Sequence, residues 1–315
     1  MRYKTKAIAV FVAVFFIFAG LSFAKIELSA EKEIVFKVDR DSNLSIENIS
    51  GEIIINSWNR NEIKVYYKKI GIGYSKSEAQ DNLERINVRV NKSGNYVKID
   101  VDYKRGGFLS FGKKDIKGHV DFDIKVPADC RLDISNVSGD TKITGIKSEI
   151  DTSNVSGDST IRDCEGRLRS STVSGNLIIE GHNGNINTST VSGDAILRNL
   201  KGSLSIEGVS GDLVIDKVSI SRLKCETVSG DIRFDGVVKS GGEIELKTVS
   251  GDIKIELPSD PGAEYSFNSF SGDLTIYHPD GKVTERSKDT SGTVGKGKVY
   301  VEMKTLSGDV KLKFK

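Results

Sequence analysis

The feature that most constrains this chain is a short phrase, Ser-Gly-Asp, that returns at nearly constant spacing. "NVSGDTKI" begins at Asn136, and "NVSGDSTI" begins eighteen residues later at Asn154. The motif Ser-Gly followed by Asp, Glu or Asn, with an apolar residue before the serine, occurs ten times: first at Gly51, and then at Gly139, Gly157, Gly175, Gly193, Gly211, Gly230, Gly251, Gly272 and Gly308. A degenerate copy, "TSGT" at 290–293, stands in the gap of 36 residues between Gly272 and Gly308. Such self-similarity indicates a repeat architecture, and we expect ten successive corners from Gly139 to Gly308.

Aligning the copies on the glycine separates apolar from polar columns. Mainly apolar residues stand seven, five and two positions before the glycine and two, four and seven positions after it. Steps of two are the alternation of a β-strand, and steps of three and four mark turns of the chain. We therefore predict an all-β fold, a β-solenoid (β-helix) of about ten coils of 18–21 residues, each with two short strands. The valine before each Ser-Gly, such as Val137, is expected to point into a core that neighbouring coils share.

The chain before the repeats has a different pattern. Between residues 25 and 128, runs such as "EIVFKV" and "YVKIDVDY" alternate apolar and polar residues, which predicts antiparallel strands. "SEAQDNLERI" at 77–86 is the expected helix, and its Ser-x-x-Gln start suits a capping box. One repeat unit, "ENISGEIII", already lies in this part. We therefore divide the chain into a leader at 1–24, an N-terminal β-rich region at 25–128 and the repeat solenoid at 129–315.

The first 24 residues predict export. A basic start, an apolar run of about fifteen residues and "SFA" form a secretory signal peptide with cleavage after Ala24. The run is shorter than the roughly 20 residues of a membrane span, and an uncleaved anchor is the alternative. Cleavage changes the formal net charge from +2 to about −1, which gives no electrostatic case for binding nucleic acid. We expect a periplasmic, cell-envelope or extracellular protein without a membrane span after cleavage.

The repeated serine and aspartate raise the question of chemistry. A catalytic serine needs a base within reach, but the chain has only three histidines and none recurs with the motif, so we expect no catalytic residue and no cofactor. The aspartates form a column along one corner: Asp140, Asp158, Asp194, Asp212, Asp231 and Asp252. Two hypotheses are open for this column. Each carboxylate accepts a backbone N–H at its own turn, or adjacent carboxylates share Ca²⁺, although the "GGxGxD" calcium repeat is missing.

Two further groups of residues concern the interior. Three positions before the glycine the chain carries mostly Asn, Thr or Ser, and we expect these side chains to form hydrogen-bonded ladders from coil to coil. Cys164 and Cys225 fall in apolar columns, which predicts reduced, buried thiols. The state of Cys130 is open.

A resemblance to a known family adds to these patterns. Serial "TVSGD" copies with apolar flanks follow a "VPADCRLDI" entry strand and a signal peptide. With these motifs the chain, from about Glu31 to Lys315, resembles the bacterial putative-adhesin repeat domain, which is similar to the GIN head domains called auto-transporter adhesins. The resemblance implies a β-solenoid with an adhesin-like or cell-envelope binding or scaffold role.

Two classes of function follow. The first is an exported, non-catalytic solenoid that binds a surface glycan or an envelope protein through one face. Self-association is part of this hypothesis, because the edge of the last coil must be capped or paired. The alternative is a carbohydrate-active enzyme with its site in the irregular coils at 235–273. The missing catalytic constellation favours the first class.

Overall fold

The computed structural model describes residues 25–103, 116–287 and 289–315, so the expected signal peptide lies outside the described residues. The described part is all-β, with 25 strands and one short helix. Within it, no helix has the length and apolar character that crossing a membrane requires. The chain divides into two compact units, unit 1 up to Ser148 and unit 2 from Glu149 onward.

Unit 1 contains parallel two-strand coils whose order differs from the order of the chain. Its elements are β1 (Ile26–Lys37), β2 (Asn43–Ser50), β3 (Ile53–Trp58), β4 (Glu62–Gly73), α1 (Lys76–Arg85), β5 (Ile86–Ser93), β6 (Tyr96–Tyr103), β7 (Gly118–Pro127), β8 (Arg131–Ser138) and β9 (Thr141–Thr144). β2 pairs in parallel with β6 on one side and with β8 on the other, and β3 lies in the same way between β7 and β9. The coils therefore stack as β6/β7, β2/β3 and β8/β9, so the region predicted as antiparallel also contributes parallel pairs.

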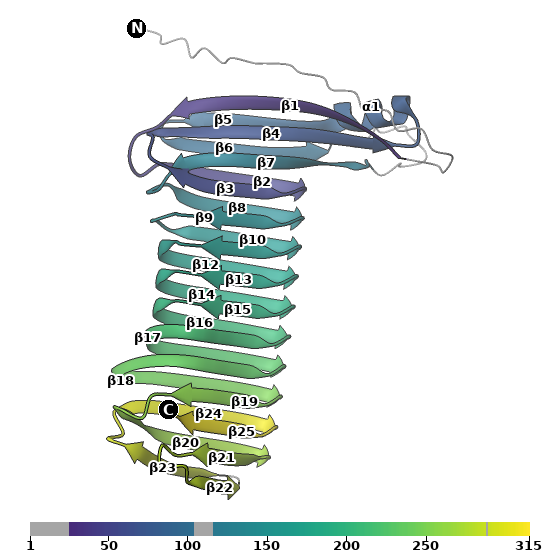
Figure 1. Cartoon of the computed structure of the whole chain (residues 1–315). Coiled ribbons are helices and arrows are strands. Elements are labelled where there is room, and N and C mark those ends of the chain that lie inside the picture. The colour runs from purple at the N-terminus through teal and green to yellow at the C-terminus, as the bar shows by residue number, and fades with distance from the viewer. Residues whose placement is uncertain (1–24, 104–115, 288) are drawn as a thin grey trace. The chain divides into compact units, whose positions relative to one another are not determined.

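Antiparallel strands cover one end of this stack. β5 pairs with β6, β4 pairs with β7, and β1 pairs with β4 (Figure 1). α1 packs on β4 and begins earlier than predicted. Ser75 Oγ accepts the Glu78 N–H at 3.1 Å, and Glu78 Oε2 accepts the Tyr74 N–H at 2.9 Å. The capping box is therefore Ser75 with Glu78 and not Ser77 with Gln80, because Ser75 has the extended backbone of an N-cap.

Unit 2 is a β-solenoid-like stack of parallel strands. Its strands are β10 (Ile150–Ser156), β11 (Ser159–Arg162), β12 (Glu165–Ser174), β13 (Leu177–Glu180), β14 (Asn183–Ser192), β15 (Ala195–Arg198), β16 (Lys201–Ser210), β17 (Leu213–Ser229), β18 (Ile232–Ser250), β19 (Ile253–Leu257), β20 (Gly262–Ser271), β21 (Asp273–Tyr277), β22 (Val283–Ser287), β23 (Thr290–Gly295), β24 (Val299–Ser307) and β25 (Val310–Phe314). β10, β12, β14 and β16 form one ladder, and β11, β13 and β15 form the other. Partners such as Leu168 and Ile186 are eighteen residues apart, which is the spacing of the repeat.

The repeat glycines turn the corners between the two ladders. Gly175 has a φ of 138°, and its N–H donates to Ser192 O in the next coil at 3.1 Å. A Cβ at this position would lie 2.2 Å from Gly157 O in the preceding coil. Only glycine tolerates both the positive φ and this close stacking of backbone.

The last coils of unit 2 depart from the predicted succession. β24 lies between β18 and β20, and β25 lies between β19 and β21. The corner of Gly308 therefore stands between those of Gly251 and Gly272, and the prediction of successive corners is wrong here. The "TSGT" copy is not a corner but part of β23, which pairs antiparallel with β20. β22 likewise pairs antiparallel with β21, so these two strands take the edge of the final coil.

The core of unit 2 lies between the two ladders of strands. Around Gly230 the buried side chains are Leu223, Cys225, Ile232 and Phe234. Thr227 is also buried at 5 %, whereas Val228 is 49 % exposed. The predicted inward valine is wrong, and so is the prediction for Val137, which is 47 % exposed. Strand alternation continues to the residue three positions before the glycine, so that residue points inward and the valine points outward.

Candidate functional site

The repeat serines stand at the corners of the coils, and all of them except Ser50 are exposed. Each histidine has a different contact: His119 Nε2 lies 3.5 Å from Asp121 Oδ2, His182 Nε2 lies 3.0 Å from Gly166 O, and His278 Nε2 lies 3.0 Å from Thr284 Oγ1. Burial lowers the pKa of His182, which occupies an apolar column. Among the described residues, no repeat serine shares a hydrogen bond with a histidine.

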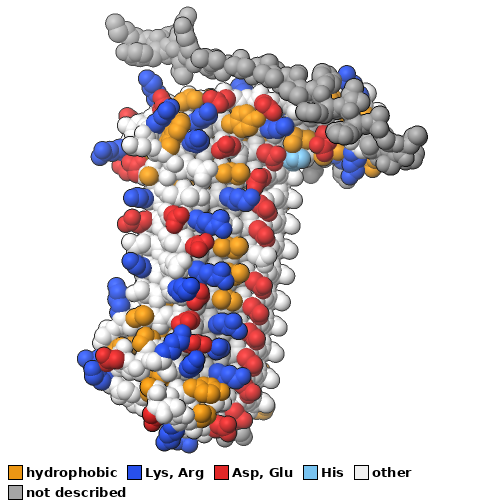
Figure 2. Space-filling model, in the orientation of Figure 1, with side chains coloured by type: hydrophobic (Ala, Val, Ile, Leu, Met, Phe, Trp, Pro, Cys, Tyr) orange, Lys and Arg blue, Asp and Glu red, His pale blue; other side chains and the backbone are white. Residues whose placement is uncertain are grey.

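The aspartate column of unit 2 is a ladder of hydrogen bonds between coils. One Oδ1 accepts the backbone N–H of the equivalent residue in the neighbouring coil at 2.8–3.1 Å: Asp158 from Asn176, Asp194 from Asp212, Asp212 from Asp231, Asp231 from Asp252, Asp252 from Asp309 and Asp309 from Asp273. Asn176 takes part too, since its Oδ1 accepts the Asp194 N–H at 3.1 Å. Figure 2 shows acidic side chains in a line along one edge. The expected bond within each turn is wrong, because stacked corners place the neighbouring coil's N–H opposite each carboxylate.

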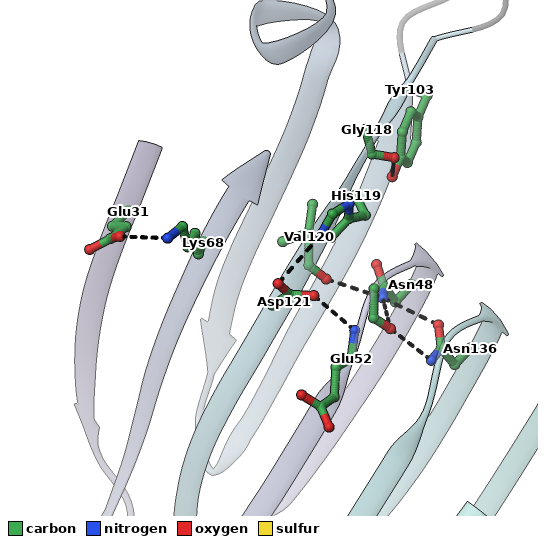
Figure 3. Close-up of polar contacts among 11 residues, drawn as sticks. Glu31, Asn48, Glu52, Lys68, Tyr103, Gly118, His119, Val120, Asp121 and Asn136 are labelled. Carbon is green, nitrogen blue, oxygen red and sulfur yellow. Dashed lines mark hydrogen bonds and ion pairs between the residues drawn. The ribbon is translucent and has the colours of Figure 1, made fainter. Parts of the chain in front are cut away.

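Unit 1 contains the same bond at a residue that the sequence did not indicate (Figure 3). Asp121 Oδ1 accepts the Glu52 N–H at 3.0 Å, although no Ser-Gly precedes Asp121. Beside it, Asn48 Nδ2 donates to Val120 O at 3.5 Å and to Asn136 Oδ1 at 3.2 Å. The register of β3 on β7 places Val120 and Asp121 where a repeat has Gly and Asp. Only this pairing, which is not readable from local sequence, identifies the position.

The calcium hypothesis stays a prediction. Within the described ranges, no group of three or more His, Cys, Asp or Glu side chains is arranged to hold a metal ion. In unit 2 the ladder carboxylates already bind backbone N–H groups, which accounts for one oxygen of each. Asp140, the first predicted member, stands at an exposed corner of unit 1.

The polar column three positions before the glycine is buried and serves the corners. Asn48 and Asn136 bond to each other, as the expected ladder requires. Other bonds in this column go to glycine carbonyls: Asn136 Nδ2 to Gly139 O at 2.9 Å, Thr190 Oγ1 to Gly193 O at 3.4 Å and Thr248 Oγ1 to Gly230 O at 3.5 Å. Thr190 and Thr248 therefore satisfy corner carbonyls, whereas the buried hydroxyls of Thr172, Thr227 and Thr305 have no hydrogen-bond partner among the described residues.

The three cysteines are free and buried. Burial raises the pKa of Cys130 to about 11 and also raises the pKa of Cys225. A thiol with a raised pKa is a poor nucleophile and a poor metal ligand. The three cysteines therefore pack in the interior as small apolar side chains.

A column of exposed apolar side chains runs along one corner of unit 2, and we call it the exposed apolar column. Its members, between 45 % and 79 % exposed, are Val155, Val173, Val191, Val209, Val228, Val249, Leu306 and Phe270. Beside it lies a groove of about 620 Å³, called here the corner groove. Its lining includes Val191, Val209, Val228, Val249, Leu306 and Phe270, with Glu226, Lys247, Asn268 and Lys304. The groove combines an apolar wall with charged and amide groups, which is the make-up of a binding surface.

Ion pairs hold the charged groups of the corner groove. Glu226 Oε1 lies 3.2 Å from Lys224 Nζ and 3.3 Å from Lys247 Nζ. Burial would raise the pKa of Glu226, but the hydrogen bonds from the two lysines outweigh it and lower the pKa. The carboxylate thus remains charged at neutral pH.

Several acids at 235–273, where the enzyme alternative places its site, are also held in ion pairs. The pairs are Asp235 with Lys315 at 2.8 Å, Glu243 with Arg222 at 3.5 Å, Glu256 with Lys254 and Lys315 at 2.9 Å each, and Asp260 with Lys296 at 2.9 Å. Hydrogen bonds from Lys315 and Lys254 lower the pKa of Glu256 to about 2. A general acid at neutral pH needs the opposite shift.

Comparisons with known proteins give one matching family and several similar solved structures. No curated protein matches the chain. Three solved structures are similar: a putative adhesin from Bacteroides fragilis NCTC 9343 (13% identity, 90% of this chain and 97% of that chain, TM-score 0.42), a putative cell adhesion protein from Clostridium sporogenes ATCC 15579 (13%, 90% and 100%, TM-score 0.20) and a putative lipid binding protein from Parabacteroides distasonis ATCC 8503 (9%, 90% and 97%, TM-score 0.38). One family model, Toastrack DUF4097, matches residues 41–313, which is most of the chain. The protein therefore belongs to the Toastrack DUF4097 family.

Proposed function

We propose that this chain is an exported, non-catalytic binding protein of adhesin-like character whose contact surface is the corner groove. The observation that carries the proposal is Phe270, which is 79 % exposed where most other coils have a half-exposed valine. Large exposed apolar groups rimmed by polar ones mark interaction sites. Covering a phenylalanine side chain contributes about 2 kcal/mol, so Phe270 is an anchor for a partner.

The parallel stack suits a contact surface of this kind. Each coil adds one apolar side chain to the exposed apolar column at intervals of about 4.8 Å. A partner can therefore gain affinity from several equivalent contacts, each of modest strength. Such a surface is extended and open, in contrast with the enclosed pocket of most enzymes.

Two observations favour binding over catalysis. The repeat serines lack a histidine partner within the described residues. Several acids of the irregular coils are held in ion pairs, and the lowered pKa of Glu256 is the reverse of what a general acid requires.

The partner and the location are part of the proposal. The leader at 1–24 supports export, and a protein on that side of the membrane meets glycans and envelope proteins. The apolar wall with Asn268 and Lys304 beside Phe270 fits either kind of partner. We place the protein in the periplasm, in the cell envelope or outside the cell.

Binding of the purified protein to envelope fractions tests the corner groove. Phe270→Ala and Val228→Ser are expected to lower the bound fraction at least fivefold, because each removes an apolar contact. Val237→Ser is the matched control, since Val237 is 48 % exposed but does not line this groove. Circular dichroism checks that all variants keep their strand content.

Two results would count against the proposal. Equal binding by wild type, Phe270→Ala and Val228→Ser would remove the groove from the contact surface. Turnover of a polysaccharide that is lost on changing acids at 235–273 would establish the enzyme alternative instead.

A further inference from the structure

A second feature of unit 2 lies on the sheet face of β12, β14, β16 and β17, apart from the corner groove. Two rows of outward side chains cross these strands, and both have the same order of residue types. One row is Glu149, Arg167, Asn185, Ser203, Arg222 and Glu243; the other is Asp151, Arg169, Asn187, Ser205, Lys224 and Glu245. Each reads acid, base, amide, hydroxyl, base, acid.

The short side chains in the middle of the rows leave a hollow. Its volume is about 320 Å³, and its lining includes Arg167, Arg169, Asn185, Asn187, Ser203, Ser205, Arg222 and Lys224. Asn and Ser form the floor, and cationic side chains from β12 and β17 form two walls. The walls are three strand spacings apart, about 14 Å. We call this hollow the cationic slot.

Acidic side chains next to the slot form ion pairs with the cations of its walls. Glu149 Oε1 lies 2.9 Å from Arg169 Nη1 and 4.0 Å from Arg167 Nη1. Beyond the other wall, Glu243 Oε2 lies 3.5 Å from Arg222 Nε. A guanidinium has five N–H donors, and one ion pair uses at most two of them. The wall arginines therefore keep donors for an anion, and the four cations are closer to the floor than the outer acids are.

We propose that the cationic slot binds a carboxylated polysaccharide chain. Arginine pairs with carboxylate through two parallel hydrogen bonds, and the amides and hydroxyls of the floor both donate to and accept from sugar hydroxyls. The slot and the corner groove share no lining residue, although Lys224 of the slot wall forms an ion pair with Glu226 of the groove. The variants that test each site therefore leave both of these residues unchanged.

The arrangement of charge favours a single narrow chain. A membrane or a nucleic-acid duplex is broad, and it would bring negative charge over the outer acids as well as the walls, where like charges repel. Within the lining there is no aromatic side chain on which a base would stack. A single uronate chain fits between the acid rows and avoids this repulsion.

Affinity electrophoresis through gels that contain polygalacturonate tests the slot with the full chain. We expect retardation by polygalacturonate and little by neutral dextran or by the fully methyl-esterified polymer, which lacks the charge. Retardation should fall at least tenfold between 50 and 300 mM NaCl, as binding to several cations requires.

Variants locate the binding. The double variant Arg167→Gln/Arg222→Gln removes one cation from each wall, and Asn187→Asp places a negative charge on the floor; each is expected to weaken binding at least tenfold. The controls are Arg162→Gln and Asn199→Asp, exposed residues outside the slot lining, and Phe270→Ala in the corner groove. These should bind as wild type does.

Three results would overturn the inference. They are no retardation of the wild type by polygalacturonate, equal retardation of the slot variants and the wild type, or equal retardation by polyglutamate, which would indicate a general response to negative charge. Loss of envelope binding in Phe270→Ala with unchanged polygalacturonate binding would support both proposed sites.

Discussion

Replacing Gly175 by alanine tests the corner geometry most directly. An L-residue at a φ of 138° is strained by roughly 1–3 kcal/mol. The new Cβ would also stand 2.2 Å from Gly157 O, which forces the two corners apart. That movement stretches two bonds between the coils, Gly157 N–H to Ser174 O at 3.1 Å and Asn176 N–H to Asp158 Oδ1 at 2.8 Å. Each is worth about 1 kcal/mol, so we expect a loss of about 3–5 kcal/mol in the free energy of unfolding.

Gly241→Ala is the matched control for this substitution. Gly241 also has a positive φ, 81°, but a Cβ there would meet nothing within 4 Å. Backbone strain alone should then lower the free energy of unfolding of Gly241→Ala by about 1 kcal/mol. Urea unfolding followed by circular dichroism measures both variants against wild type. A difference below about 1 kcal/mol between Gly175→Ala and Gly241→Ala would refute the argument from close corner stacking.

Four further predictions concern the ladder, the thiols, the acids and the exposed column. Asp212→Asn should change the free energy of unfolding by less than about 0.5 kcal/mol, because the amide of Asn176 already serves as an acceptor in this ladder. Asp212→Ala should lower it by about 1 kcal/mol, because the acceptor for the Asp231 N–H is lost. The melting temperature should be the same with EDTA and with Ca²⁺, and a higher value with Ca²⁺ would support the calcium hypothesis. Cys130, with a pKa raised to about 11 by burial, should react with a thiol reagent at pH 8 only after unfolding; rapid reaction of the native protein would contradict this. Because the pKa of Glu256 is lowered to about 2, its contribution to stability is complete above the ordinary pKa of 4.5 and disappears as the pH falls through about 2; the stability difference between wild type and Glu256→Gln, measured by urea titration across that range, should shrink accordingly. Val209→Ser should cost less than about 0.5 kcal/mol in urea unfolding because Val209 is half exposed, while Ile206→Ser should cost more than about 3 kcal/mol; similar losses would mean that Val209 is buried after all.

The repeat columns predicted most of the core but misplaced one of them. Leu204, Ile206 and Leu213 are buried at the expected positions. Val209 was expected inside because it is apolar, and Thr190 was expected in a ladder because it is polar. Side chains alternate between the two faces of a strand, and this alternation places the threonine inward, where its hydroxyl bonds to a corner carbonyl, and the valine outward. An apolar residue type is therefore a weaker guide at a corner than the strand period.

The sites depended on contacts that local sequence does not contain. Asp121 joins a ladder bond only because β7 pairs with β3. The cationic slot needs residues from four coils, and its pattern appears only when the coils are read across the strands, not along the chain. Because the order of the final coils differs from chain order, the neighbours of Phe270 and Leu306 also required the structure.

The position of β24 and β25 has a consequence for how unit 2 is completed. The coil formed by β20 and β21 precedes these strands in the chain, yet its parallel neighbours are β24 and β25. If coils were added in chain order, the stack could not reach its final arrangement directly after β19, because the places beside β18 and β19 belong to β24 and β25. Only when residues 299–314 emerge can they enter between two existing layers and form both sets of backbone hydrogen bonds. During synthesis the unit would remain open until residues 299–314 are available, and a force applied to that segment would have to break two strand interfaces together.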